Sequence, residues 1–331
     1  MTEPYILPSP SLTVYDLKND TVSELRIGDR FEYPTVLCLG NFDGVHIGHR
    51  ALIDRTSEIV KTLKASYPTI VSGAWFFSHT TKTYLNGTPC PELTTLQEKL
   101  ALLKMLGADF AFVADFPSFR DLSAESFVCE ILMNLCNCRF SVCGYDFRFG
   151  KKACGNAETL KAFFKDFCET VDCVKYDSIP AASSTVREYL YNGDVEAAAK
   201  MLGHPYSVTS AVVHGKQLGR TLGFPTANLI FPENKLIPKH GVYATLVKIK
   251  DLGKTYIGVS NVGKNPTVND KNNVTCETYI LDFSGDIYGK EICVEFHKML
   301  REEKKFSSID ELTSAISKNA DQARELLKNM I

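Results

Sequence analysis

The chain has 331 residues, of which 44% are hydrophobic and 23% are charged. A chain of this length can form two domains of ordinary size with sizeable cores, which excludes a small fold held together by disulfides. Its 37 basic and 39 acidic residues give a net charge of -2, which is too small to favour nucleic acid or an anionic membrane as a partner. The sequence contains no run of about 18 apolar residues that could span a bilayer, so we expect a soluble globular protein.

The N-terminal segment and the cysteines indicate the cellular compartment. Three prolines fall within the first ten residues and no basic segment precedes an apolar one, so we expect no secretory signal. The 11 cysteines have no regular spacing, and the closest group, Cys136, Cys138 and Cys143, lacks the C-x-x-C pair of a zinc site. We therefore expect reduced thiols in a cytoplasmic protein.

The first half of the chain alternates apolar strands with amphipathic helices. Apolar and β-branched residues predict buried strands at 35–39, 110–113 and 140–143, and helices after the first strand, at 95–106, at 123–135 and near 158–167. Thr95 and Glu98 form a capping box for the second helix, and Gly107 ends it. This alternation predicts an α/β fold with a parallel, doubly wound, Rossmann-like sheet up to about residue 180.

The second half has a different periodicity. Two short helices are expected at 185–191 and 195–202, and short strands at 208–213, 241–250, 256–259, 274–281 and 291–296. Strands at such spacing predict an antiparallel barrel or sandwich, of which we favour the β-barrel. A capping box of Ser308 and Glu311 opens a terminal helix beside it. We predict a first domain over residues 1–190, a linker over 191–205 and a second domain over 206–331.

The first motif, GNFDGVHIGH, runs from Gly40 to His49 directly after the strand at 35–39. Parallel sheets bind ligands at the carboxyl ends of their strands, and a helix N-terminus offers N–H groups to phosphate. His46 and His49 are three residues apart, and two imidazoles there could hold the charge that builds on a phosphoryl group during attack. A single histidine at such a place is more often a cap, but the full string resembles the H-x-G-H signature of nucleotidyltransferases, which favours nucleotidyl transfer.

The second motif, GKQLGRTLGFPTAN, covers residues 215–228, which we expect to form a loop. Backbone N–H groups of a glycine-rich loop can surround phosphates, and the oxygens of Thr226 and Asn228 suit Mg²⁺. Glu277, in the strand at 274–281, could accept a proton from a substrate hydroxyl. By itself, Glu277 would more often be a solvated strand residue.

The two motifs together, in this order, resemble the bacterial family of bifunctional riboflavin kinase and FAD synthetase, which phosphorylates riboflavin to FMN and then adenylylates FMN to FAD. The resemblance covers nearly the whole chain. It includes LTTLQEK at 93–99, GYDFRFG at 144–150, SSTVR at 183–187, HGVY at 240–243, LDF at 281–283, YGK at 288–290 and LREEKKF at 300–306.

The resemblance implies two sites, with ATP, Mg²⁺, riboflavin and FMN as ligands. In the adenylyltransferase site, His46 and His49 would be catalytic, with ATP bound by Gly40, Asn41, Phe42, Asp43, Gly44, Gly48, Ser184, Thr185 and Arg187, and flavin by Asp146 and Phe147. In the kinase site, Glu277 would be the base, with Mg²⁺ bound by Thr226 and Asn228, flavin by Arg301, and ATP by Gly215, Lys216, Gly219, Arg220, Gly223, Phe224 and Pro225.

Three strings depart from the family's usual pattern. Residues 76–80 read FFSHT where the family has F-x-P-H-P, so we expect a less ordered loop there. SSTVR is one residue out of step with the usual S-S-T-x-I-R, and GKNPT at 263–267 lacks one threonine. Two alternatives stay open: a riboflavin kinase whose N-terminal domain has lost catalysis, and a flavin-binding regulator with neither activity.

Overall fold

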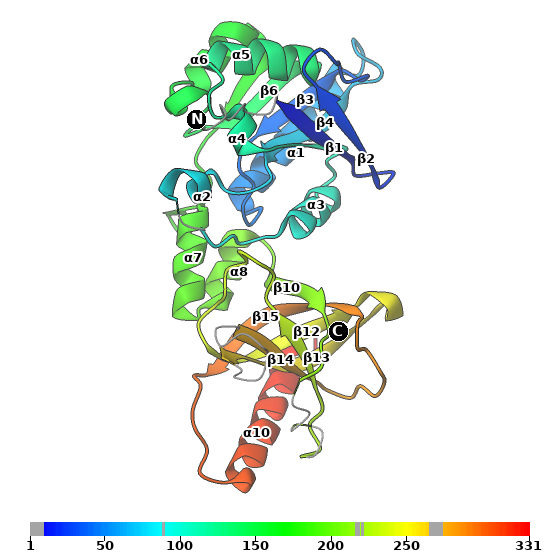
Figure 1. Cartoon of the computed structure of the whole chain (residues 1–331), viewed down its shortest axis with the longest axis vertical. Coiled ribbons are helices and arrows are strands. Elements are labelled where there is room, and N and C mark those ends of the chain that lie inside the picture. Colours follow the sequence, from blue (N-terminus) through cyan, green and yellow to red (C-terminus); the bar gives the residue numbers. More distant parts are fainter. Residues whose placement is uncertain (1–9, 88–89, 216–218, 220–221, 265–273) are drawn as a thin grey trace, which may run out of the picture. The chain divides into compact units, whose positions relative to one another are not determined.

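The computed structural model describes residues 10–87, 90–215, 219, 222–264 and 274–331. The chain divides into two compact units, Met1–Ala181 and Ala182–Ile331 (Figure 1). Within the described ranges, none of the helices has the length and apolar character needed to cross a membrane.

A seven-stranded sheet forms the centre of the first unit, in the order β2-β1-β5-β4-β3-β6-β7. The strands are β1 Ser11–Asp16, β2 Thr21–Arg26, β3 Thr35–Leu39, β4 Val71–Phe77, β5 Phe110–Ala114, β6 Cys138–Gly144 and β7 Cys168–Val171. The five neighbouring strands β5, β4, β3, β6 and β7 are parallel, whereas β1 is antiparallel to both β2 and β5. The predicted parallel sheet is confirmed, and β1 and β2 extend it with an antiparallel edge.

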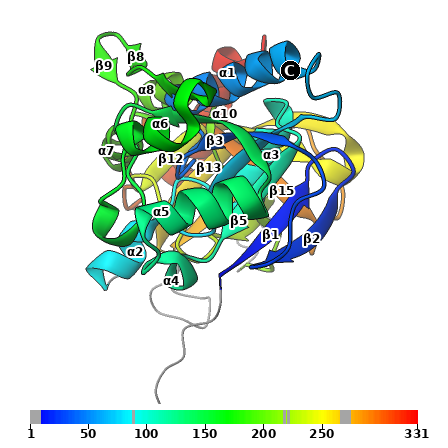
Figure 2. The same cartoon turned by 90° about the horizontal axis from the view of Figure 1, so that it is seen from above.

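Helices cover both faces of this sheet (Figure 1). They are α1 Ile47–Leu63, α2 Thr81–Asn86, α3 Leu96–Met105, α4 Phe116–Phe119, α5 Ala124–Ser126, its π-helical continuation Phe127–Leu135, α6 Ala157–Phe164, and 3₁₀ turns at Lys151–Ala153 and Lys165–Phe167. α1 and α3 pack on the face that includes Val36 and Cys38. The segment Phe127–Leu135 and α6 pack on the face that includes Leu37 and Trp75. A small hairpin of β8 Lys175–Tyr176 and β9 Ile179–Pro180 projects from this unit (Figure 2).

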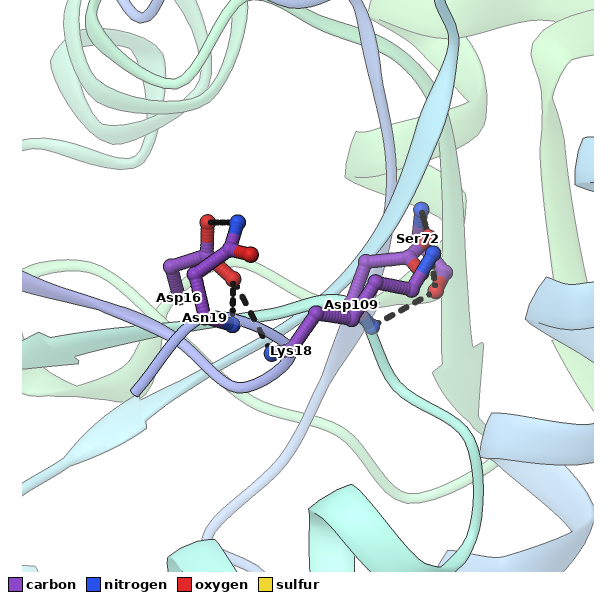
Figure 3. Close-up of polar contacts among 5 residues, drawn as sticks. All are labelled: Asp16, Lys18, Asn19, Ser72 and Asp109. Carbon is purple, nitrogen blue, oxygen red and sulfur yellow. Dashed lines mark hydrogen bonds and ion pairs between the residues drawn. The ribbon is translucent and has the colours of Figure 1, made fainter. Parts of the chain in front are cut away.

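Asp109, just before β5, ties together three segments of the first unit (Figure 3). Its carboxylate accepts hydrogen bonds from the N–H of Ser72 at 2.8 Å and from its hydroxyl at 2.9 Å, and it pairs with Lys18. Asp16 accepts from the N–H groups of Lys18 and Asn19, both at 2.9 Å, in the turn after β1. The cluster lies at the amino ends of β4 and β5, away from the edge where parallel sheets bind ligands, so we interpret it as structural.

The second unit begins with α7 Ser183–Asn192 and α8 Val195–Leu202, and α8 packs on β10 and β15. Its antiparallel sheet has the order β10-β15-β12-β13-β14-β11. The strands are β10 Tyr206–Ala211, β11 Thr226–Ile230, β12 Gly241–Ile249, β13 Lys254–Lys264, β14 Val274–Ile280 and β15 Glu291–Arg301, with a 3₁₀ turn at Lys250–Leu252. A bridge between Val213 and Asn228 brings the two edges of the sheet together, as in the predicted barrel. The predicted loop ends earlier than expected, because Thr226 and Asn228 pair with β14 as part of β11.

The terminal helix, α10 Ile309–Leu327, packs on β12 and β13 through residues that include Ala320 and Ala323. Ser308 caps it by accepting a hydrogen bond from the Glu311 N–H at 3.2 Å. The Glu311 carboxylate accepts from the N–H of Ser307 at 3.0 Å instead of returning to Ser308. The predicted helix is confirmed, but only the Ser308 half of its capping box forms.

Candidate active sites

The loop after β3 has a strained backbone that its buried side chains hold in place. Phe42 has φ = 50° and Val45 has φ = 42°, in the left-handed region that such side chains rarely adopt. Both side chains are buried in the core shared with α1. Such conformations persist where packing over-determines them, and they concentrate at functional sites. The loop therefore fixes the position of His46 at the start of α1.

His46 and His49 lie together at this helix start. His46 is the N-cap of α1, and its ring accepts a hydrogen bond from the His49 N–H at 3.4 Å. The two rings stack with their centroids 3.7 Å apart, and the Phe42 ring lies 4.9 Å from that of His49. Across the described part of the chain, the buried Nδ1 of His49 has no hydrogen-bond partner. A buried nitrogen in this situation is suited to contact a ligand atom.

Burial keeps both imidazoles neutral at pH 7. It lowers the pKa of His46 to about 4, although the nearby Asp43 carboxylate acts in the opposite direction. Burial also lowers the pKa of His49 well below its usual value, and His46 and Lys99 lower it further. Each neutral ring has one N–H and one unprotonated nitrogen, so it can donate a hydrogen bond to a phosphate oxygen without carrying a positive charge.

A second layer of buried polar groups supports the loop. The Asp43 side chain is 5% exposed, and its carboxylate accepts a hydrogen bond from the N–H of Leu93 at 2.8 Å. Lys99 Nζ, on α3, donates to the carbonyl of Asn41 at 3.2 Å. Sequence reasoning assigns the string at 93–99 no chemical role, because its contacts with the 40–44 loop arise only in the folded chain. The available signal was a lysine that shares a helical face with apolar Leu103.

Hydrogen bonds hold the loop after β4, where the two prolines of the resembled family are missing. The N–H of Ser78 donates to the carbonyl of Ala114 at 2.9 Å, and that of Thr80 donates to Glu92 Oε1 at 2.8 Å. Glu92 is 6% exposed, and the same oxygen lies 3.3 Å from Nδ1 of His79. A proline at position 78 or 80 would have no N–H to donate. Backbone hydrogen bonds that prolines could not form thus hold the loop that we expected to be less ordered.

The predicted flavin residues follow the strand next to the one that leads to His46. β3 pairs with β4 on one side and with β6 on the other, and parallel sheets bind ligands where the strand order reverses in this way. Asp146 is exposed just beyond β6, and the Phe147 ring stacks on that of Phe149 at 5.7 Å. The other residues predicted to bind ATP, Ser184, Thr185 and Arg187, lie in α7 of the second unit.

In the second unit, two glycines allow atoms at the start of β11 to lie close to the backbone of the preceding segment. A Cβ atom on Gly215 would lie 2.6 Å from the Asn228 carboxamide, and one on Gly219 would lie 2.4 Å from the carbonyl oxygen of Phe224. Side chains do not fit at such distances, which explains the glycines. Nδ2 of Asn228 donates to the carbonyl of Thr226 at 3.4 Å. The Thr226 hydroxyl and Asn228 Oδ1 are hard oxygen donors two residues apart on one strand, and this donor set fits Mg²⁺.

Glu277 stands in the middle of a polar row across three strands. In β14 it lies directly opposite Asn228 of β11 and Asn261 of β13. Because directly opposed residues have Cβ atoms about 4.5–5.5 Å apart, the row places a carboxylate between two carboxamides. Asn261 was not predicted, since the strand expected there ended at residue 259. Its position became evident only from the register of β13 against β14.

Arg301 ends β15 and is held by α10. Its Nε donates to Oδ1 of Asn319 at 3.0 Å, and its guanidinium carbon lies 5.3 Å from the centre of the Phe306 ring. Burial lowers the pKa of Arg301, while Glu303 acts in the opposite direction. Of the remaining predicted kinase residues, Gly223, Phe224 and Pro225 lead into β11, whereas Lys216 and Arg220 lie outside the described residues.

The cysteines do not form a metal site in the described structure. None of the 11 cysteines, all of which lie in the described ranges, forms a disulfide, and Cys136, Cys138 and Cys143 are buried in or beside β6. In the described ranges, no group of three or more His, Cys, Asp or Glu residues is placed to hold a metal ion.

Comparisons with known proteins cover both units. Residues 29–185 match the family model for FAD synthetase, and residues 202–327 match that for riboflavin kinase. The chain is 33% identical to a bifunctional riboflavin kinase/FMN adenylyltransferase of Bacillus subtilis, covering 89% of this chain and 93% of that one. It is 36% identical to a protein of the same name from Haemophilus influenzae, covering 87% and 92% of the two chains.

A solved structure has the same fold over almost the whole chain. It is titled as a macrolide-efflux protein from Streptococcus pneumoniae, with a TM-score of 0.78 and 29% identity, covering 89% of this chain and 95% of that one. Both units, in their order along the chain, therefore have counterparts in known proteins. The chain belongs to the family of bifunctional riboflavin kinase/FMN adenylyltransferases.

Proposed function

We propose that the chain converts riboflavin to FAD in two ATP-dependent steps, one in each unit. In the first, a riboflavin hydroxyl oxygen bonds to the γ-phosphorus of ATP, giving FMN and ADP. In the second, a phosphate oxygen of FMN bonds to the α-phosphorus of another ATP, giving FAD and pyrophosphate. The observation that carries this proposal is the presence of both family matches in one chain. It favours neither a kinase with an inactive N-terminal domain nor a non-catalytic regulator.

For adenylyl transfer, we assign His46 and His49 to the phosphates of ATP. Charge shifts onto the pyrophosphate as its bond to the α-phosphorus breaks, and preorganised donors aimed at that charge lower the barrier. Two neutral, stacked imidazoles at a helix N-terminus are suited to this task. The backbone of Gly40–Gly44 and Gly48 would bind the nucleotide with Ser184, Thr185 and Arg187, and Asp146 and Phe147 would contact the flavin.

For phosphoryl transfer, we assign Glu277 as the group that accepts the proton of the riboflavin hydroxyl. Thr226 and Asn228 would hold the Mg²⁺ that accompanies ATP, which would neutralise charge on the phosphates when bound. The loop of Gly215, Lys216, Gly219, Arg220, Gly223, Phe224 and Pro225 would bind ATP, and Arg301 would lie near the flavin. We place the enzyme in the cytoplasm, since a chain with 11 cysteines and no disulfide among them is compatible with a reducing environment.

Incubation of the protein with riboflavin and Mg-ATP, followed by separation of FMN from FAD, tests this function. We expect both products. His49→Ala should lower FAD formation from FMN by about 10²- to 10³-fold and leave FMN formation unchanged. Glu277→Gln should lower FMN formation by about 10²- to 10⁴-fold and leave FAD formation from added FMN unchanged. FMN as the sole product of the unaltered protein would show that the N-terminal unit is inactive, and absence of both products would leave only a binding protein.

A further inference from the structure

We propose that Lys99 is a positioning residue for adenylyl transfer, which fixes the loop after β3 by holding the carbonyl of Asn41 from inside the first unit. This inference rests on the proposed function, because it concerns the loop that carries His46. Neither the sequence motifs nor the comparisons assign Lys99 a role.

Lys99 is almost completely buried, with 2% of its surface exposed. It lies in the first turns of α3, where it shares a face with Leu103, which is also buried. Burying an ammonium group is far more costly than burying a methionine of similar length. An apolar side chain would therefore serve better at this position if only packing mattered.

The contacts of the ammonium group show what offsets this cost. Nζ donates a hydrogen bond to the carbonyl of Asn41 at 3.2 Å and lies 4.8 Å from the centre of the Phe76 ring. Burial lowers the pKa of Lys99, whereas the carboxylates of Asp43 and Glu92 favour its charged form. The ammonium group thus lies near the carboxyl ends of two neighbouring strands, because Asn41 follows β3 and Phe76 is near the end of β4.

The segment that leads into α3 contacts the same two loops. In the first loop, the Asp43 carboxylate accepts a hydrogen bond from the N–H of Leu93, and the Gly44 N–H donates to the hydroxyl of Thr94. In the second loop, the N–H of Thr80 donates to Glu92. Residues 92–99 therefore contact both loops, and the Lys99 ammonium group adds the contact with the Asn41 carbonyl. The strained φ values of Phe42 and Val45 lie between the Asn41 carbonyl and His46. Release of that carbonyl would let the loop relax and move the imidazoles relative to the phosphates.

The test compares two buried-site variants with a matched control on the same helix. Lys99→Met keeps the length of the side chain and removes the charge, whereas Lys99→Gln keeps a polar donor in case the first variant does not fold. Lys104→Met is the control, because Lys104 is an exposed residue of α3 that pairs with Asp20 at 2.6 Å. Lys99→Arg restores the charge. FMN formation by the same chains measures how much active protein is present.

We expect kcat for FAD formation from FMN to fall by about 10- to 100-fold in Lys99→Met and Lys99→Gln, to recover in part in Lys99→Arg, and to stay within twofold in Lys104→Met. Amide exchange should accelerate at Gly44 and Val45, which bond to Thr94 and Phe42, but not along β3. Unchanged kcat in Lys99→Gln, or exchange accelerated equally throughout the sheet, would overturn the proposal. If the unaltered protein forms no FAD, the proposed function fails and not the role of Lys99.

Discussion

At the scale of single residues, the buried histidine pair makes the stability of the first unit depend on pH. The pKa of His46 falls from 6.5 in the unfolded chain to about 4 in the folded one. Between these values the unfolded state binds more protons, so stability decreases as pH falls from about 6.5 to about 4, by about 3 kcal/mol in total. His46→Asn keeps an N-cap acceptor and should show a weaker pH dependence.

Amide exchange in α1, measured from pH 7 to pH 4.5, checks this prediction. It reports on the first unit alone, whereas global melting of a two-unit chain mixes both transitions. His204→Asn in the second unit is the matched control and should keep the full pH dependence. An unchanged dependence in His46→Asn would assign the proton uptake to other groups.

Gly215 supports a second prediction at this scale. In Gly215→Ala, the new methyl group would meet the Asn228 carboxamide at 2.6 to 2.7 Å, so Asn228 must move. Displacement of this proposed Mg²⁺ ligand by a fraction of an ångström should lower FMN formation by about tenfold or more, with a higher KM for Mg-ATP. FAD formation from added FMN is the internal control, and equal loss of both activities would indicate general misfolding instead.

The candidate residues that the sequence suggested differ in one physical respect from those that only the structure brought forward. His46, His49 and Glu277 belong to local strings or chemically conspicuous positions. Lys99 stands out by its burial and its contact with Asn41, and Asn261 by its register opposite Glu277. Both properties involve segments that are far apart in the chain. No spacing in the sequence reveals that Asn41 needs a donor from α3. These residues therefore required the folded structure.

At the scale of elements, the sequence predicted those features of helices and strands that depend on contacts between residues close together in the chain. The capping box of Thr95 and Glu98 forms at α3 as predicted. β2 was missed because its side chains are almost all exposed, so it lacks the apolar alternation of a half-buried strand. β11 was missed because it begins within the glycine-rich string, and its pairing with β14 outweighs the turn residues before it.

The loop after β4 gives a prediction opposite to the one that the resemblance suggests. Thr80→Pro removes the N–H that donates to buried Glu92, and loss of this donor to a buried carboxylate should cost about 1–3 kcal/mol. We expect the variant to raise the KM for ATP in FAD formation and to lower the melting temperature. Thr81→Pro is the matched control, since the first position of α2 tolerates proline. Tighter ATP binding in Thr80→Pro would contradict our interpretation.

At the scale of the whole molecule, the boundary between the two units falls between Ala181 and Ala182, just before the SSTVR string. Ser184, Thr185 and Arg187, which we assign to adenylyl transfer, lie in α7 of the second unit. α7 and α8 are anchored within that unit: the N–H of Lys239 donates to the carbonyl of Leu190 at 2.9 Å, and Lys298 pairs with Glu196 at 3.3 Å. The residues that we propose for adenylyl transfer therefore belong in part to the first unit and in part to the second.

This arrangement predicts how two fragments of the chain will behave. Fragment 182–331 keeps α8, whose Ala198, Met201 and Leu202 are buried and which packs on β10 and β15; it should fold and convert riboflavin to FMN at a rate near that of the full chain. Fragment 206–331 lacks these side chains, and the burial of Met201 and Leu202 alone contributes about 3–6 kcal/mol, a large part of a typical domain stability of about 5–15 kcal/mol. Its melting temperature and FMN formation should both fall sharply. Equal activity and stability of the two fragments would show that α7 and α8 are dispensable to the barrel and belong functionally to the first unit alone.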